Sequence, residues 1–368
     1  MRFNTIKIED ALDELIDYRG KTPKKSETGI MTLSAKSVKN NYIDYSQCYY
    51  ISEEEYNKFM VRGFPKKGDI LLTTEAPLGM VARLDRDDVA IAQRLLTLRG
   101  KKDVLDNDYL LYYLQSPVGQ ASLRARETGT TVTGIKQVEF KKMEIKVPNY
   151  ENQKKVSCIL KTIDEKIELN CKINKNLEQQ AQAIYSRMFI EHRQESWSTG
   201  QLSDLISVKY GKDHKKLADG NYPVYGSGGI MRYVEKPLYT GESVLIPRKG
   251  TLNNVMYVNE AFWSVDTMFY TEMLRPNIAK FVYHFVKSKD LASLNAGSAV
   301  PSMTTNILNA IQLYIPDEKT LDKFENIVSP MYSAMQENTK ESKILANTRD
   351  ILLPRLMSGE LNVSDLDI

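Results

Sequence analysis

The sequence predicts an α+β protein: two globular domains with irregular β-sheets, separated by two long helices packed as an antiparallel coiled coil, with a pseudo-twofold internal repeat. Three observations lead to this prediction. Residues 128–148 align with residues 296–316 at an offset of 168 positions, which indicates an internal duplication. Short apolar runs broken by Gly, Pro and Asn precede both stretches, as in irregular sheets. A heptad-like apolar pattern follows both and favours a coiled coil.

The composition is that of a folded protein from a reducing compartment. With 368 residues and 42% hydrophobic content, the chain is long enough for two or three domain cores. The net charge of +3 and the pI near 8.4 are too mild to identify a nucleic-acid-binding protein by themselves. Cys48, Cys158 and Cys171 have no CxxC spacing and are expected to be free thiols. Neither a membrane span nor a signal peptide is recognisable, so we expect a cytoplasmic protein.

The globular domains are predicted at residues 1–150 and 196–316. Strand-like runs such as "DILLTT" in the first and "SVLIPR" in the second are bounded by turn residues. Each domain also contains one short amphipathic stretch that predicts a helix, "DNDYLLYYLQS" (106–116) and "NIAKFVYHFVKS" (277–288). Both domains are therefore expected to be α+β.

The helical segments are predicted at residues 151–195 and 317–368. Apolar residues recur in both at steps of three and four over five heptads, a pattern typical of a coiled coil. The first helix is expected to run from Glu151 to Phe189. A helix of about 39 residues at 1.5 Å per residue is ~58 Å long, which is more than a compact domain of this size needs. Pro148 and Pro316 end the strands that precede the two helices. The helices are interpreted as a spacer between the globular domains.

A polar residue occupies the central a-type position of each helix, Asn170 in the first and Asn338 in the second. In an antiparallel pair the two midpoints cross, so the amides are expected to meet and form a hydrogen bond. A buried Asn at such a position costs stability but fixes register and orientation. The alternative is that both Asn side chains lie on a solvated shoulder of the helices.

No catalytic constellation is recognisable in the sequence. His192, His214 and His284 are widely separated, and no nucleophile motif accompanies them. The "GSGG" stretch (226–229) lacks the rest of a phosphate-binding loop and is interpreted as a turn. "PDEK" (316–319) resembles part of a nuclease motif but is more simply a helix N-cap. Metal-ligand spacings and methyltransferase signatures are also missing, so catalysis by this chain alone is not expected.

Two loops rich in basic residues are candidates for DNA phosphate contacts, because Lys and Arg release counterions and Gly lets the backbone come close. They lie near the start of each globular domain, and this shared position favours a shared role. For either loop alone, a simply solvated charge run is the alternative. The candidates are Arg19, Lys21, Thr22, Lys24 and Lys25 in the first domain and Lys209, Tyr210, Lys212, His214, Lys215 and Lys216 in the second.

Other loops contain the hydroxyl, amide and basic side chains that read base edges in DNA grooves. For any single residue, the alternative is a turn that merely connects two strands. The candidates are Thr73, Thr74, Thr130, Thr131 and Lys136 in the first domain and Tyr225, Ser227, Arg232, Arg248, Lys249, Asn253 and Asn254 in the second.

Several stretches together resemble the specificity subunit of Type I restriction-modification systems. They are "DYRGKTPKKS", "GDILLTT", "GKDHKKLADGNYPVYGSGGIMRYV", "IPRKGTLNNVMYV", "FWSVDTMFY" and "RDILLPRLMSGEL". Each stretch is weak alone, but their order, with a helix after each globule, is specific. The resemblance covers nearly the whole chain.

The resemblance implies a non-catalytic DNA reader that serves DNA methylation and phage defence. Its two target recognition domains would each read one half of a bipartite site, and the coiled coil would set the gap. Because reading on one face of the duplex favours whole helical turns, we predict half-site centres about 10 base pairs apart. Expected partners are double-stranded DNA, methyltransferase (modification) subunits, two of them, and restriction motor-nuclease subunits. S-adenosylmethionine, ATP and Mg are expected on those partners, and no cofactor on this chain. The alternatives are a single-chain nuclease or methyltransferase with a divergent active site, or a coiled-coil scaffold that binds only protein.

Overall fold

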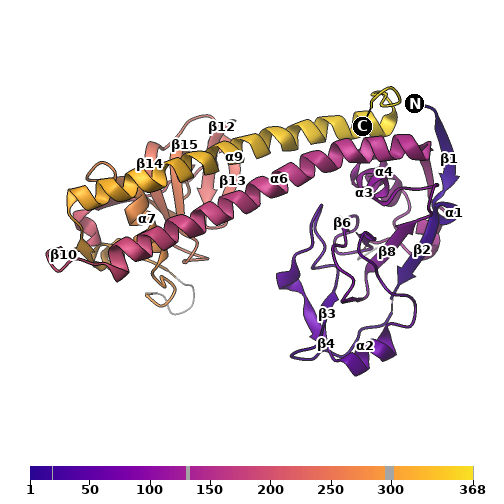
Figure 1. Cartoon of the computed structure of the whole chain (residues 1–368), viewed down its shortest axis with the longest axis horizontal. Coiled ribbons are helices and arrows are strands. Elements are labelled where there is room, and N and C mark those ends of the chain that lie inside the picture. Colours follow the sequence, from indigo (N-terminus) through magenta and orange to yellow (C-terminus); the bar gives the residue numbers. More distant parts are fainter. Residues whose placement is uncertain (19, 130–132, 295–301, 368) are drawn as a thin grey trace. The chain divides into compact units, whose positions relative to one another are not determined.

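The computed structural model describes residues 1–18, 20–129, 133–294 and 302–367. Its contacts divide the chain into two compact units (Figure 1): unit 1 is Met1–Leu169 with Lys340–Ile368, and unit 2 is Asn170–Thr339. Each unit contains one of the predicted globular domains and a part of each long helix. The predicted domain boundaries after residues 150, 195 and 316 divide the chain differently and stay a prediction.

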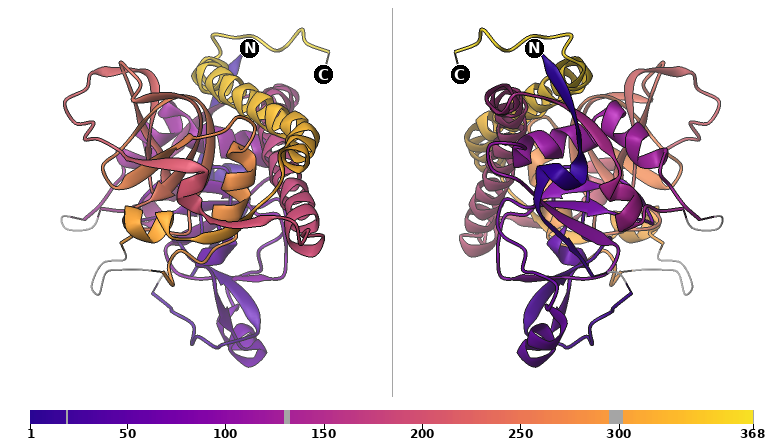
Figure 2. Two further views of the ribbon diagram at one scale, coloured as in Figure 1. Left: turned by 90° about the vertical axis from the view of Figure 1, so that its left-hand side faces the viewer. Right: turned by 90° about the vertical axis from the view of Figure 1, so that its right-hand side faces the viewer.

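The globular part of unit 1 is built from short strands in three small sheets and from several short helices. Its elements are β1 (Phe3–Lys7), α1 (Ile8–Ala11), β2 (Leu12–Asp17), β3 (Ile30–Leu33), η1 (Tyr45–Gln47), β4 (Tyr49–Ile51), α2 (Glu53–Phe59), β5 (Ile70–Thr73), β6 (Val81–Arg83), β7 (Val89–Ile91), β8 (Leu95–Gly100), α3 (Asn107–Gln115), α4 (Pro117–Arg124), α5 (Gln137–Lys141) and β9 (Glu144–Pro148). The strand orders are β2-β8-β5-β6, β4-β3-β7 and β1-β9. Within unit 1, β3, β4 and α2 lie farthest from the long helices (Figures 1 and 2).

Unit 2 uses longer strands in one larger sheet. Its elements are η2 (Ser186–Glu191), β10 (Ser198–Gln201), η3 (Leu202–Asp204), β11 (Ile206–Tyr210), β12 (Asp219–Gly226), β13 (Gly229–Val234), β14 (Tyr239–Pro247), β15 (Met256–Ser264), β16 (Met268–Met273), α7 (Ala279–Lys287), α8 (Thr305–Asn309) and β17 (Gln312–Ile315). The six-stranded sheet has the order β11-β16-β14-β15-β12-β13, and β10 pairs with β17. As predicted, "GSGG" forms the turn between β12 and β13.

The two units repeat one topology. The order β2-β8-β5-β6 in unit 1 corresponds to β11-β16-β14-β15 in unit 2. The remaining strands correspond through a parallel pair, β3 beside β7 in unit 1 and β12 beside β15 in unit 2, and through the hairpins β3–β4 and β12–β13. In unit 2 the single long strand β15 therefore takes the place of β6 and β7. This correspondence confirms the internal repeat.

The joints between the globular parts and the long helices also correspond. The N–H of Ile8 donates to the carbonyl of Met143 over 2.8 Å in unit 1, and the N–H of Leu202 donates to that of Ile311 over 2.9 Å in unit 2. Each long helix then begins after an N-cap side chain: Asn149 accepts from the Asn152 N–H and Asp317 from the Thr320 N–H, both over 2.9 Å. The cap predicted for "PDEK" is confirmed, and each helix begins within one residue of its predicted start.

The long helices are α6 (Tyr150–Tyr185) and α9 (Glu318–Ser358). Within each unit their segments run antiparallel, as the pairs Lys166–Glu341 in unit 1 (3.2 Å) and Asn174–Met335 in unit 2 (3.1 Å) indicate. The first helix was expected to stay α-helical to residue 189, but its last turn is the π-helical η2. That turn contains Phe189, whose ring centroid lies 4.8 Å from that of Phe281.

The two central Asn residues meet inside unit 2. Asn170 is fully buried, and its side-chain amide donates to the main-chain oxygen of Asn338 over 3.4 Å. The side chain of Asn338 donates to Oδ1 of Asn174 over 2.8 Å, a partner that the heptad pattern did not indicate. Burial of Asn170 argues against the solvated-shoulder alternative for that residue. The role of the two Asn residues in fixing register stays a prediction.

Each unit has two hydrophobic clusters. One lies between the globular part and the long helices and includes Phe140, Val156 and Leu160 in unit 1, and Tyr185 and Phe324 in unit 2. The other lies in the part with the parallel strand pair. Burial of such side chains stabilises the fold by roughly 1.5–3 kcal/mol each. The helices therefore pack against one part of each unit, and strand-end loops elsewhere remain open to solvent.

Candidate nucleic-acid interface

Both predicted basic loops follow corresponding edge strands. Strand β2 pairs Asp17 with Leu96, and strand β11 pairs Tyr210 with Phe269, at equivalent places in the two sheets. The chain leaves each sheet at that point and enters the basic loop. The equivalent placement inferred from the sequence is thus a feature of the fold. Whether these loops contact DNA stays a prediction.

In unit 1 the basic side chains of the loop point to solvent, while its main chain is fixed by a hydrogen bond. The side chains of Lys21, Thr22, Lys24 and Lys25 are exposed. The N–H of Lys24 donates to Oε1 of Glu55 over 2.9 Å, and Nζ of Lys25 lies 4.8 Å from the centroid of the Tyr49 ring. Arg19 lies outside the described residues. The loop thus combines an ordered main chain with exposed charges.

The basic loop of unit 2 is anchored in the same manner. Gly211 lies so close to the sheet that a Cβ there would come within 2.0 Å of the Val265 carbonyl oxygen, and the indole N–H of Trp263 donates to the Lys212 carbonyl over 2.9 Å. Lys212, Lys215 and Lys216 are exposed, His214 is half-buried, and Lys209 forms an ion pair with Glu272 at 3.4 Å. The three exposed lysines are the available cations of this loop.

Loops from three other places in the unit 2 sequence meet at the same end of the sheet. The Arg248 guanidinium lies 5.3 Å from the Tyr210 ring centroid, and its Nη1 donates to the Asp266 carbonyl over 3.2 Å. The Asn254 side chain donates to the Ser227 carbonyl over 2.7 Å and so holds the glycine-rich turn against this loop. We name this group the unit 2 loop cluster; its members are Tyr210, Lys212, Ser227, Arg248, Lys249 and Asn254.

Three further candidates of unit 2 are engaged in contacts of their own. Arg232 donates to the Leu217 carbonyl over 3.0 Å and pairs with Asp219 at 2.7 Å. The Tyr225 hydroxyl donates to Glu260 over 2.6 Å, and burial together with this carboxylate raises the pKa of Tyr225. Asn253 donates to Asp290 over 3.0 Å and accepts from the Ala292 N–H over 3.0 Å. These side chains stabilise the loops that surround the cluster.

In unit 1 the predicted base-reading residues have different environments. Thr73 is fully buried, and its hydroxyl donates to the Pro77 carbonyl over 2.6 Å and accepts from the Met80 N–H over 2.9 Å. Thr74 is 2% exposed, and Lys136 is exposed. DNA cannot reach either buried hydroxyl without rearrangement of the loop, so Thr73 and Thr74 contribute to its shape. Thr130 and Thr131 lie outside the described residues.

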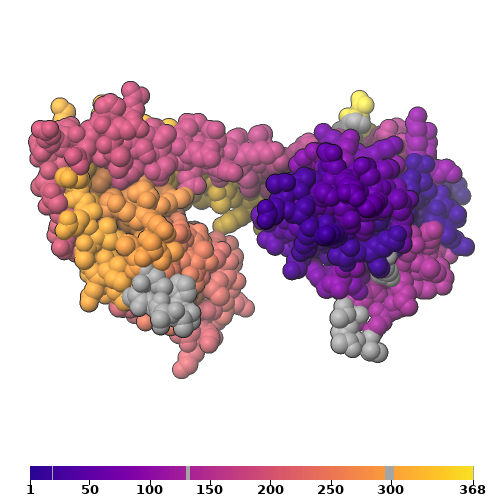
Figure 3. Space-filling model, turned by 90° about the horizontal axis from the view of Figure 1, so that it is seen from below, coloured from indigo at the N-terminus to yellow at the C-terminus, as the bar shows by residue number. Residues whose placement is uncertain are grey.

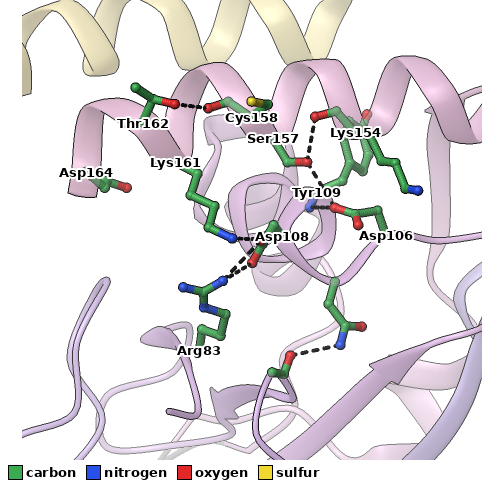
Figure 4. A network of polar contacts seen from close by, with 12 residues as sticks. Arg83, Asp106, Asp108, Tyr109, Lys154, Ser157, Cys158, Lys161, Thr162 and Asp164 are labelled. Atoms are coloured by element: carbon green, nitrogen blue, oxygen red, sulfur yellow. Dashed lines mark hydrogen bonds and ion pairs between the residues drawn. The ribbon is translucent and has the colours of Figure 1, made fainter. Parts of the chain in front are cut away.

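Polar networks attach the globular part of each unit to its long helices. In unit 1, the Asp108 carboxylate on α3 accepts from Arg83 on β6 and from Lys161 on α6, both over 3.0 Å (Figure 4). Tyr112 on α3 donates to Asp164 on α6 over 2.9 Å, and Arg349 of α9 donates to the same carboxylate over 2.8 Å. Burial raises the pKa of Tyr112, so its hydroxyl stays protonated as a donor.

In unit 2, the corresponding helix α7 has different polar groups. Lys280 is almost fully buried and pairs with Glu242 at 2.7 Å and with Glu325 of α9 at 2.6 Å. The imidazole of His284 lies between Gln182 of α6 (2.8 Å) and the Tyr332 hydroxyl of α9 (2.9 Å). Burial lowers the pKa of His284 to about 4, so the imidazole is neutral at pH 7.

Two exposed arginines of unit 1 were not selected from the sequence. Arg62 donates to the Asp17 carbonyl over 2.8 Å and so lies beside the strand end that leads into the basic loop. Arg94 directly precedes β8 and has a left-handed backbone, φ +70°. An alignment of β8 with β16 places Arg94 at the position of Thr267, next to the unit 2 loop cluster. Such an alignment would have drawn attention to Arg94.

A duplicated α+β unit with a pair of long antiparallel helix segments defines the structural class of the chain. Figure 3 shows one face of the molecule in a space-filling view. The family model described as the Type I restriction modification DNA specificity domain matches residues 9–179 and 194–344. The chain therefore belongs to this family, with one domain copy in each half.

Individual relatives agree with this assignment. The Type I restriction enzyme MjaIX specificity subunit of Methanocaldococcus jannaschii is 23% identical over 359 residues, covering 86% of this chain and 82% of that protein. The EcoprrI specificity subunit of Escherichia coli is 23% identical and covers 78% of each chain. The crystal structure of a Type I restriction-modification system S subunit from M. genitalium has the same fold, with a TM-score of 0.65 at 20% identity over 97% of this chain and 96% of that one.

Within the described ranges, no cluster of three or more His, Cys, Asp or Glu side chains has the geometry to hold a metal ion. The same part of the chain contains no helix that is both long and apolar enough to span a membrane. Cys48 is half-buried, and Cys158 and Cys171 are exposed; all three are free thiols, as predicted.

Proposed function

We propose that this chain is the DNA specificity subunit of a Type I restriction-modification complex, and that each unit reads one half of a bipartite double-stranded target. The observation that supports this most strongly is the repeated placement of basic loops: each follows the corresponding edge strand of a duplicated fold. Two equivalent basic surfaces suit two half-sites of one duplex, because phosphate contacts position a protein while base edges specify it. Family membership supports the same conclusion.

The long helices are proposed to set the unread gap between the half-sites and to dock the methyltransferase subunits. Helix α6 has 36 residues and α9 has 41, so at 1.5 Å per residue they are ~54 and ~62 Å long. Methyltransferase subunits, two of them, and motor-nuclease subunits are the proposed partners, and S-adenosylmethionine, ATP and Mg would act there. The complex would work in the cytoplasm of a bacterium or archaeon.

The chain itself is proposed to be non-catalytic. A reader needs exposed donors and acceptors on a rigid scaffold, whereas a hydrolase or methyltransferase needs a convergent catalytic group and a cofactor or metal site. The polar groups described on α3 and α7 form hydrogen bonds and ion pairs with the long helices and so attach helices to one another. They are therefore suited to a structural role.

A selection experiment tests this proposal. The full-length chain is incubated with a randomised duplex library at about 150 mM salt, and bound DNA is sequenced. We expect enrichment of two specified segments separated by a gap of unspecified sequence. Enrichment of no motif would contradict the reader function, and the absence of any salt-sensitive DNA affinity would favour a scaffold that binds only protein. Incubation of the chain alone with DNA, magnesium and S-adenosylmethionine should give no product; turnover would favour a divergent nuclease or methyltransferase.

A further inference from the structure

At the unit 2 loop cluster, the end of one strand is held by main-chain hydrogen bonds to two other segments. We call this arrangement a strand-end joint, and it has an equivalent in unit 1. In unit 2, the Arg248 N–H donates to the Thr267 carbonyl and the Arg248 carbonyl accepts from the Met303 N–H, both over 2.9 Å. In unit 1, the Thr74 N–H donates to the Arg94 carbonyl over 3.0 Å and the Thr74 carbonyl accepts from the Ile135 N–H over 2.9 Å. Thr74 thus occupies the place of Arg248, and Arg94 the place of Thr267.

Each joint presents one arginine side chain, but from opposite strands. In unit 2 it is Arg248, and in unit 1 it is Arg94, which lies on the other strand of the joint. In unit 1 the Arg94 side chain is 51% exposed, and its Nε lies 2.6 Å from Oε1 of Glu75. Glu75 follows Thr74 and therefore occupies the place of Lys249, which follows Arg248. The joint of unit 1 has one positive and one negative group, whereas that of unit 2 has two positive groups.

Stability does not account for Arg94. A left-handed backbone is unfavourable for a residue with a Cβ atom, and φ at Arg94 is +70°. An exposed ion pair such as Arg94–Glu75 contributes little to folding free energy. Strained backbone that supports an exposed polar side chain is typical of functional positions.

We propose that Arg94 and Glu75 form a base-reading pair in the first recognition domain, directed at a G·C base pair of the first half-site. This inference rests on the proposed DNA-reading function and names its substrate group. Arginine donates two hydrogen bonds to O6 and N7 of guanine, and a glutamate accepts one from N4 of cytosine. Glu75 would repel a phosphate, so the pair suits neutral base edges better than the DNA backbone. Lys249 in the equivalent place of unit 2 lacks this repulsion.

The variant Arg94→Gly tests the pair while it relieves the backbone, because glycine adopts positive φ without strain. Affinity is measured for the duplex selected by the wild-type chain and for a scrambled duplex, over a series of salt concentrations. We expect binding of the selected duplex to weaken about tenfold or more, binding of the scrambled duplex to stay unchanged, and Tm to be equal or higher. Glu75→Gln should change the preferred base at the same position, and Arg124→Ala, which removes an exposed arginine of α4, should change neither affinity.

Three results would overturn the inference: equal losses on both duplexes with a flatter salt dependence, which indicates a phosphate contact; unchanged affinity with a lower Tm, which indicates a structural ion pair; or a first half-site without any G·C pair. Failure of the proposed function itself is distinguishable, because the wild-type chain would then select no motif at all.

Discussion

Protonation of His284 should destabilise unit 2 in mildly acidic solution. In its neutral form the imidazole donates to the side-chain oxygen of Gln182 and accepts from the Tyr332 hydroxyl, so both partners are satisfied without a buried charge. Burial lowers its pKa to about 4, and the nearby Lys287 acts in the same direction while Glu178 opposes it. In the unfolded chain the pKa of a histidine is about 6.5.

The direction and size of the effect follow from these two values. Below pH 6.5 the unfolded state binds more protons than the folded state, so stability falls as the pH falls and is fully present above about pH 7. The difference between 6.5 and about 4 corresponds to about 3 kcal/mol in total. About 2 kcal/mol of this should be lost between pH 7 and pH 5.

Denaturant unfolding followed by tryptophan fluorescence measures this loss in unit 2, because the only two tryptophans, Trp197 and Trp263, lie there. His284→Gln cannot titrate, so its free energy of unfolding should vary about 2 kcal/mol less than that of the wild-type chain between pH 7 and pH 5. His192→Gln, at an exposed position, is the matched control variant. An unchanged pH dependence in His284→Gln would refute the assignment of a neutral, buried imidazole.

Three further predictions concern the DNA surface and the helix pair. Replacement of Lys212, Lys215 and Lys216 by Ala should weaken binding to all DNA sequences and reduce the salt slope by about 2.7, or 0.9 per lost phosphate contact; a loss confined to one sequence would contradict a phosphate role. Asn338→Leu should lower the free energy of unfolding of unit 2 by about 1–2 kcal/mol, because it leaves the Asn174 amide oxygen unpaired. Replacement of both Asn174 and Asn338 by Leu should recover this loss in the fluorescence assay. A double variant as unstable as the single one would refute the pairing. Deletion of one heptad from both long helices should shorten the preferred gap in a binding selection, and an unchanged gap would contradict the spacer role.

The parts of the fold that depend on local sequence patterns could be predicted. The joints at Pro148 and Pro316, the long helices and the short helices after each sheet follow from apolar periodicity, prolines and cap residues, and the structure confirms them. The π-helical end of the first long helix escaped prediction, because hydrophobic spacing does not distinguish α from π geometry at a single turn.

The candidate site could be predicted only in part. Basic loops on corresponding strands were recognisable because charge and position are both local features. The burial of Thr73 depends on how its loop folds back on Pro77 and Met80, which sequence alone does not encode. Arg94 was missed because its significance comes from pairing between distant strands, the same reason that the parallel pairs β3–β7 and β12–β15 were not foreseen.

Genome-wide mapping of methylated bases tests whether each unit reads its own half of a bipartite target. Cells with the wild-type gene, without the gene, and with Arg248→Ala are compared. We expect a bipartite methylated motif that disappears without the gene and that Arg248→Ala relaxes in one half only. A methylation map that is unchanged by deletion of the gene, or a variant that alters both halves equally, would contradict a chain in which each unit reads its own half-site.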